Sequence, residues 1–153
     1  MIPTLIIALT QMVLRPSAGG AHCSSPFNCN FLGFAIMPVL GYGVSLFLHA
    51  AETYKLIYIT VAFIIGLYGI LKSAPYFTQN KPRALSRNRL LKNRSIVFSL
   101  IIYILSSVFI FFSIDVWSLG MSTALLWQGV MLLPVGIRSI NSVDSFLNRL
   151  LSK

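Results

Sequence analysis

Residues 96–114 of the chain read IVFSLIIYILSSVFIFFSI, a run of 19 residues without a charged side chain. An α-helix needs about 20 predominantly apolar residues to cross the hydrocarbon core of a bilayer. The run therefore predicts a membrane-spanning helix. The composition agrees, because 56% of the 153 residues are hydrophobic and 10% are charged, unlike a soluble globular protein. A chain of this length is expected to form a single domain.

Further apolar stretches lie on both sides of this run. Residues 31–48, 56–71 and 116–137 predict three more spans. The expected fold is thus an all-α, polytopic membrane bundle with four full transmembrane helices. Residues 1–14 are apolar but short, which indicates a partial span. The tail, residues 138–153, has apolar residues at helical spacing opposite polar ones, which favours an amphipathic helix lying in the headgroup plane.

The longest polar segment, residues 72–95, holds seven of the 12 Lys and Arg residues and no acid. Basic loops stay in the cytoplasm, so alternation of the spans puts residues 15–30 and the tail on the cytoplasmic side as well. The turns at residues 49–55 and at Asp115 then lie outside, with Lys55 as the one basic residue there. Since topology accounts for the net charge of +9, we do not expect nucleic-acid binding.

Residues 15–30 (RPSAGGAHCSSPFNCN) are the chemically richest part of the chain. They hold both cysteines and one of the two histidines. A thiol and an imidazole are the groups that cysteine-nucleophile catalysis requires. Pro16 and Pro26 argue against one unbroken helix and favour a shaped catalytic loop or a broken helix at the membrane surface.

Within this stretch, His22 is the candidate base and Cys29 the candidate nucleophile. Their spacing of seven would put them two turns apart on one helix, whereas a fold-back at Pro26 could bring them within hydrogen-bond reach. Cys23 points away from its neighbour His22 in any regular backbone, so it is the weaker nucleophile. The alternative is that these residues are incidental. A metal site is not expected, because the spacing matches no common zinc pattern and a fourth ligand is missing.

A third catalytic group is hard to find among the three acids. Glu52 and Asp115 are expected outside, and Asp144 lies in the tail. The sequence therefore favours a catalytic dyad over a triad. The residues that could orient the imidazole are Asn28, Asn30 and Gln79.

Two ordered motifs resemble those of a known family. Residues 15–22 (RPSAGGAH) are followed by Cys29, seven residues beyond the histidine. Residues 74–82 (APYFTQNKP), followed by a basic run, resemble an Ala-Pro … Lys-(Lys/Arg)-Pro loop. Together with the order of the spans, these motifs resemble the accessory gene regulator B family, and the resemblance extends from about Leu14 to the tail.

The resemblance implies a multi-pass cysteine endopeptidase in the plasma membrane of a Gram-positive bacterium. Such proteins cleave an AgrD-like propeptide on the cytoplasmic side and help to form a cyclic thiolactone or lactone signal for quorum sensing. Cys29 would be the nucleophile and His22 the general base, while Arg15, Gly19 and Gly20 would shape the site. The Gly19 and Gly20 amides are candidate oxyanion donors. The implied partners are the propeptide and membrane lipid, a homodimer is compatible, and no cofactor is implied.

Two choices remain open on the sequence. The basic loop either anchors the topology and binds anionic lipid, or it docks an acidic part of the propeptide through Lys81, Arg83 and Arg87. Family members usually carry a longer region before the motif, with an amphipathic segment and a further apolar span, so we expect a chain that is short at its N-terminus. The alternative to an enzyme is an inactive truncated remnant or a non-enzymatic small transport or accessory protein. Transport is disfavoured because the spans contain no acidic or basic residue.

Overall fold

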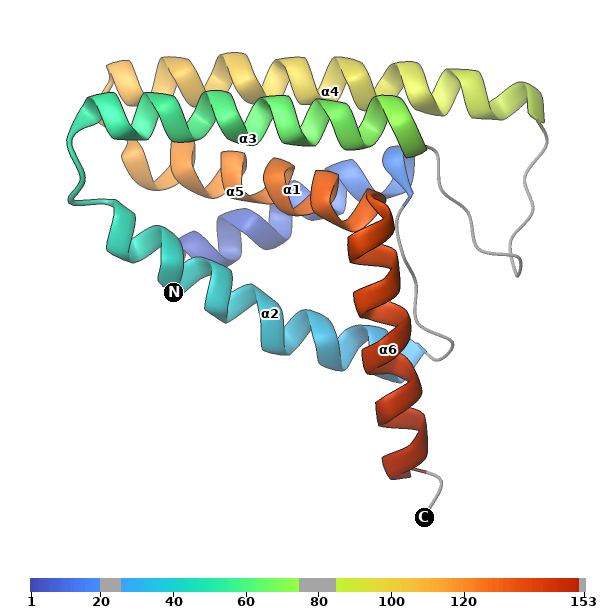
Figure 1. Cartoon of the computed structure of the whole chain (residues 1–153). Helices are drawn as coiled ribbons and strands as arrows, with labels where there is room; N and C mark the ends of the chain where they lie inside the picture. Colours follow the sequence, from blue (N-terminus) through green and yellow to red (C-terminus); the bar gives the residue numbers. More distant parts are fainter. Residues whose placement is uncertain (20–25, 75–84, 152–153) are drawn as a thin grey trace.

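The computed structural model describes residues 1–19, 26–74 and 85–151. Every regular element in these ranges is an α-helix, as the apolar runs predict (Figure 1). The six helices are α1 (Ile2–Ala18), α2 (Pro26–Phe47), α3 (Glu52–Ser73), α4 (Leu85–Phe111), α5 (Asp115–Leu132) and α6 (Pro134–Leu151).

Within the described residues, two helical segments are long and apolar enough to cross a membrane, Glu52–Ser73 and Arg89–Phe111. A third candidate is the bent pair of α5 with the first part of α6. Ile2–Ala18 and Leu32–Phe47 are apolar but shorter. The all-helical class is therefore confirmed, and the described residues hold two candidate membrane spans, or three if the bent pair counts as one; the four full spans expected from the sequence are not confirmed.

The span expected over residues 116–137 is broken. α5 ends at Leu132, and α6 begins at Pro134 after a bend of 80°. Proline has no N–H and disfavours helical geometry in the residue before it, and Leu133 accordingly adopts an extended conformation with φ −77° and ψ 155°. Proline is well suited to the first position of the next helix. The tail helix thus starts four residues before the expected residue 138.

α5 is the central helix, since it contacts each of the other five. α3 and α4 lie side by side over α5, and α1 packs against α5 as well (Figure 1). Side chains from these helices form the main buried cluster, which includes Leu14 of α1, Ile70 of α3, Ile102 of α4 and Leu125 of α5. α5 thereby holds together the helices that come before the basic segment (α1, α2 and α3) and those that follow its start (α4 and α6).

Helices α3 and α5 cross at glycines. A Cβ atom added to Gly69 would lie 2.5 Å from the Gly129 carbonyl oxygen, and one added to Gly129 would lie 2.5 Å from the Gly66 Cα. Lipid tails are as apolar as leucine, so membrane helices associate largely through such close backbone approach at small residues. The glycines explain how the two backbones approach so closely, with the buried Leu125 side chain of α5 packed onto Gly66 of α3.

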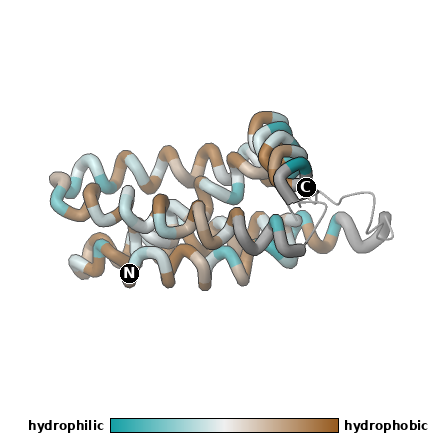
Figure 2. Tube along the Cα trace, turned by 90° about the horizontal axis from the view of Figure 1, so that it is seen from below, coloured by the Kyte–Doolittle hydropathy of each residue, from teal (hydrophilic) through white to brown (hydrophobic). Residues whose placement is uncertain are grey.

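Large apolar side chains cover the outer surface of the bundle. Figure 2 shows apolar positions along the length of the outer helices. Ile64 of α3 and Ile104 of α4, for example, are 59% and 58% exposed. An apolar surface of this extent is rare on soluble proteins and suits contact with lipid.

The two ends of the bundle differ. At one end, Lys55 of α3 forms a salt bridge with Asp115 at the start of α5, and their side chains are 7% and 24% exposed. At the other end lie the last turn of α1, the first turn of α2 and the start of α6 (Figure 1). The sequence placed Lys55 and Asp115 on the same side of the membrane, and the salt bridge agrees with that arrangement.

Candidate functional site

The motif that resembles a peptidase spans the end of α1 and the start of α2, and we call this region the candidate site. Arg15 to Ala18 continue α1 through Pro16, and residues 26–30 belong to α2. Both ends of the loop expected over residues 15–30 are thus helical, and residues 20–25 lie outside the described residues. Pro26 takes the first position of α2, which its fixed φ favours.

Gly19 ends α1 in a conformation that favours glycine. Its φ is 71° and its ψ is −153°, and its N–H donates to the Arg15 carbonyl oxygen at 3.0 Å. Its own carbonyl accepts a hydrogen bond of 2.7 Å from Nε2 of Gln128, which is 2% exposed. Both backbone groups of Gly19 therefore have partners within the described chain, which disfavours its amide as an oxyanion donor. The role of Gly19 in the site remains a prediction.

Cys29 lies in the first turn of α2, and the structure describes its backbone but not its side chain. The other residues expected in the site, Gly20, His22 and Cys23, lie outside the described residues. The pairing of Cys29 with His22 therefore remains a prediction.

The residue before Cys29 has a partner that the sequence did not suggest. Asn28 is 1% exposed, and its Nδ2 donates to Oδ1 of Asp144 at 2.7 Å. Asp144, which is 9% exposed, lies on α6, 116 residues later in the chain. The sequence set Asp144 apart in the tail, whereas the structure brings this carboxylate to the turn that carries Cys29. The one available signal was that Asp144 is the only acid of the tail.

The bend between α5 and α6 makes this contact geometrically accessible. α6 leaves the end of α5 at a steep angle and crosses the start of α2 (Figure 1). An apolar cluster holds it there, because Ile140 of α6 packs with Met131 of α5, together with Trp127, Val130 and Ile137. The polar face of the tail helix thus contacts another helix at Asp144, in addition to facing water.

A groove of about 420 Å³ lies between α1 and α2 and borders the candidate site. Arg15 and Gly33 line one part of it, and Gly33 is four residues after Cys29 in α2. The remaining lining residues are mostly apolar: Thr4, Ala8, Gln11, Met12, Phe34, Met37 and Pro38. We call this the α1–α2 groove. Its shape and lining suit an apolar segment of a peptide.

The comparison with protein families decides the identity. The family model described as "Accessory gene regulator B" matches residues 1–132. The chain belongs to the accessory gene regulator B family. This confirms the resemblance drawn from the two motifs. The match ends at Leu132, the last residue of α5, so α6 lies beyond it.

Two relatives show how far the similarity to individual family members extends. A putative AgrB-like protein of Clostridium perfringens (strain SM101 / Type A) is 29% identical over 161 residues, which cover 98% of this chain and 75% of the relative. The accessory gene regulator protein B of Staphylococcus aureus (strain N315) is 27% identical over 135 residues, which cover 86% of this chain and 66% of the relative. No solved structure matches the chain.

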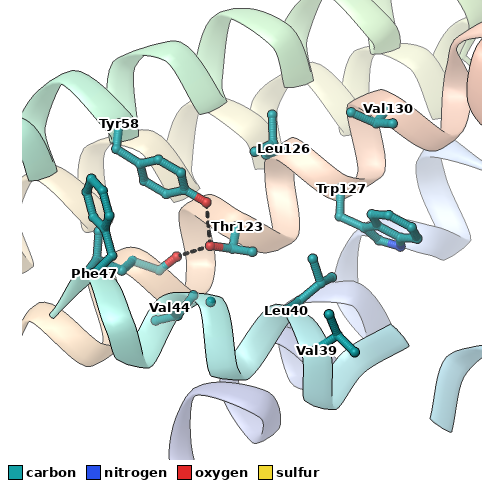
Figure 3. A pocket seen from close by; sticks show the side chains of 11 residues that line it. Val39, Leu40, Val44, Phe47, Tyr58, Thr123, Leu126, Trp127 and Val130 are labelled. Atoms are coloured by element: carbon teal, nitrogen blue, oxygen red, sulfur yellow. Dashed lines mark hydrogen bonds between the residues drawn. The ribbon is translucent and has the colours of Figure 1, made fainter. Parts of the chain in front are cut away.

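This member of the accessory gene regulator B family also has an apolar cavity of about 380 Å³ between α2, α3 and α5. Figure 3 shows the Tyr58 hydroxyl pointing to Thr123, and the two oxygens are 2.7 Å apart. Because the Thr123 hydroxyl donates to the Leu119 carbonyl, Tyr58 is the donor of that bond. The lining residues that the structure describes include no thiol, imidazole or carboxylate and are mostly apolar, which suits an apolar ligand.

The expected docking residues are only partly within the described chain. Lys81 and Arg83 lie outside it, and for Arg87 the backbone in α4 is described but not the side chain. A further cation of the same segment, Lys92, donates to the Leu71 carbonyl oxygen at 2.6 Å and so ties α4 to the end of α3. Part of the positive charge therefore has a structural role.

Among the described residues, no three His, Cys, Asp or Glu side chains gather as they would around a metal ion. The second histidine, His49, borders a hollow with Asp115, at the end of the bundle opposite the candidate site. Within the part of the chain that the structure describes, it therefore has no connection with the Cys29 turn.

Proposed function

We propose that the chain is a membrane cysteine endopeptidase that cleaves an AgrD-like propeptide through an acyl-thioester and produces a cyclic peptide for quorum sensing. The observation that carries this proposal is the arrangement of the family motif. Arg15, near the end of α1, and Cys29, in the first turn of α2, lie toward the same end of the bundle, and the α1–α2 groove is lined by Arg15 and by Gly33, one turn after Cys29 (Figure 1). A peptide in the groove would run past both.

The position of Cys29 favours a reactive thiolate. The first turn of an α-helix is the positive end of its dipole, and thiolates are stabilised there. The turn is also anchored, because the neighbouring Asn28 is buried and hydrogen-bonded to another helix. A nucleophile on an anchored turn loses little free energy in reaching its reactive position.

The proposed reaction has two steps. His22 takes the proton of the Cys29 thiol, the thiolate attacks a propeptide carbonyl, and the C–N bond breaks as His22 returns the proton to the leaving amine. The amide of Gly20 is the remaining glycine candidate for stabilising the oxyanion. In the second step, an internal Cys or Ser of the propeptide gives its proton to His22 and attacks the thioester carbonyl. The bond between that carbonyl and the Cys29 sulfur breaks, which closes the ring, and His22 returns the proton to the Cys29 thiolate.

Ring closure requires that water does not reach the thioester first. The mostly apolar lining of the α1–α2 groove supports this condition, because a peptide that fills the groove displaces water. The proposed topology places the site on the cytoplasmic side, with α2 and α5 completing four spans alongside α3 and α4. The basic segment then faces the same side as the propeptide.

The nucleophile is tested by cleavage in liposomes. Cys29→Ala should abolish release of the C-terminal fragment of the propeptide, while the matched variant Cys23→Ala should keep most of the activity. His22→Ala should slow alkylation of Cys29 at neutral pH, because the thiolate fraction falls. Undiminished cleavage by Cys29→Ala would refute the proposed function.

The docking role of the basic segment has its own test. Replacing Lys81, Arg83 and Arg87 by Gln should raise KM more than it lowers kcat, because charge attracts an acidic segment without taking part in the reaction. The salt dependence of KM should also weaken, since ions screen exposed charges beyond about 8–10 Å. A variant with the same salt dependence as the parent would instead favour the lipid-binding role.

A further inference from the structure

We infer that Asp144 is a positioning residue of the proposed peptidase, which holds the Cys29 turn in place through Asn28. The contact itself is a property of the structure, whereas its effect on catalysis rests on the proposed function. Asn28 immediately precedes Cys29, and its amide donates to the Asp144 carboxylate at 2.7 Å. Nothing in the family motif assigns a role to Asp144, which lies beyond the residues that the family model matches.

The burial of Asp144 calls for an explanation. Asn141, Ser142 and Ser145, its polar neighbours on α6, are exposed, whereas Asp144 is 9% exposed. A carboxylate loses hydration when it is buried, so this arrangement persists only where hydrogen bonds replace the lost water. Hydrogen bonds to an ionised acceptor are about twice as strong as those between neutral groups. The hydrogen bond from Asn28, at the first turn of α2, thus meets part of the cost of burying Asp144.

Attachment of α6 does not by itself require this bond. The packing of Ile140 against Met131 and its neighbours already fixes α6 to the end of α5. The bond to Asn28 instead joins α6 to α2, and it does so one residue before the proposed nucleophile. Its specific effect is therefore on the position of that turn.

The first turn of a helix is where such a contact matters most. The first four N–H groups of a helix have no partner within the helix, and terminal turns fray unless something holds them. Asn28 is the third residue of α2. A fixed Asn28 therefore keeps the turn helical up to Cys29. It thereby also maintains the positive end of the helix dipole, which stabilises a thiolate.

The sharpest test exchanges the two partners. Asn28→Asp alone places two carboxylates together and should lower kcat about tenfold to a hundredfold, the usual cost of losing a buried hydrogen bond to a charged group. Asp144→Asn alone loses the charge of the acceptor and should lower kcat about fivefold. The double variant restores one amide and one carboxylate and should recover to within about threefold of the parent, so that the two changes are strongly non-additive.

Two readouts separate positioning from general stability. KM should change by less than about twofold, because Asp144 does not line the α1–α2 groove. In a Cys23→Ala background, the rate at which iodoacetamide alkylates Cys29 should fall in both single variants and recover in the double variant. The matched control is Ser145→Ala, which changes an exposed neighbour on α6 whose hydroxyl bonds to Asn141 of the same helix and should alter neither readout.

The alkylation assay needs no propeptide, so it judges the inference even if the proposed function fails. Parent-like alkylation and kcat in both single variants would overturn the inference. A double variant no better than Asn28→Asp, at equal helix content and membrane yield, would overturn it as well. If Cys29→Ala still cleaved the propeptide, the proposed function would be refuted. Alkylation of Cys29 that still depended on Asp144 in the Cys23→Ala background would nevertheless support the positioning role.

Discussion

The crossing of α3 and α5 predicts that one methyl group should destabilise the protein markedly. In Gly69→Ala, the new Cβ would lie 2.5, 2.8 and 2.9 Å from the carbonyl oxygen, Cα and carbonyl carbon of Gly129. All three are backbone atoms, so no side chain can rotate away to make room. The two helices must move apart instead, and α5 is the helix that all others contact.

The size of the effect follows from the contact distances. Ordinary contacts of a Cβ begin at 3.4 Å, so the shortest of the three contacts must lengthen by about 0.9 Å. Overpacking a well-packed interior costs about 1–3 kcal/mol. We expect a cost at the upper end of that range, because the new methyl group meets only backbone atoms and whole helices must move to make room. Alanine recovers about 1 kcal/mol through its higher helix propensity. The matched variant Gly43→Ala gains the same propensity, but its Cβ meets nothing within 4 Å.

Because both variants gain the same helix propensity, their free energies of unfolding should differ by about 3 kcal/mol, which is the steric cost alone. For a chain of this length that corresponds to a difference in Tm of about 6–12 °C, with Gly69→Ala lower. The assay is thermal unfolding in detergent micelles, followed by circular dichroism and by loss of monodisperse protein on size exclusion. Midpoints within about 2 °C of each other would refute the close α3–α5 crossing.

Three further outcomes follow from the described contacts. Lys55→Met should lower the thermal midpoint more than the double change Lys55→Met with Asp115→Leu, because a lone buried charge costs more than an apolar pair; the reverse order would contradict the salt bridge. Gln128→Leu should destabilise the protein by about 1–3 kcal/mol, since it removes the donor to the carbonyl that ends α1, and an unchanged midpoint would show that this bond contributes nothing. In a Cys23→Ala background, a membrane-impermeant maleimide should label Cys29 in inverted vesicles but not in intact cells, and labelling from outside would overturn the topology.

Much of the fold follows from the sequence because its signals are local. Runs such as residues 96–114 are apolar over the length of a bilayer, and nothing but a helix satisfies their backbone there. The break before Pro134 was also encoded locally, yet prolines are tolerated within membrane helices. The sequence could not tell a tolerated proline, such as Pro38 inside α2, from one that ends a helix.

The motif residues of the candidate site could be predicted from the sequence, whereas the contact with α6 that holds the Cys29 turn could not. Arg15, His22 and Cys29 lie close together in sequence, and their order carries the resemblance to the family. Asp144 was separated from this group because a helical face with polar residues usually meets water. Its contact with the start of α2 depends on the bend of 80° between α5 and α6, a property of the packed bundle that no local pattern contains.

The bond between Asn28 and Asp144 also has a consequence for biogenesis. The ribosome adds Asp144 116 residues after Asn28, which at about 5–20 residues per second takes about 6–23 s. The remainder of α2 and all of α3, α4 and α5 are synthesised during that interval, and α6 is completed only after it. A nascent chain therefore has to synthesise α6 before Asn28 can bind Asp144, which on the proposed function would delay proteolytic competence until α6 has been made.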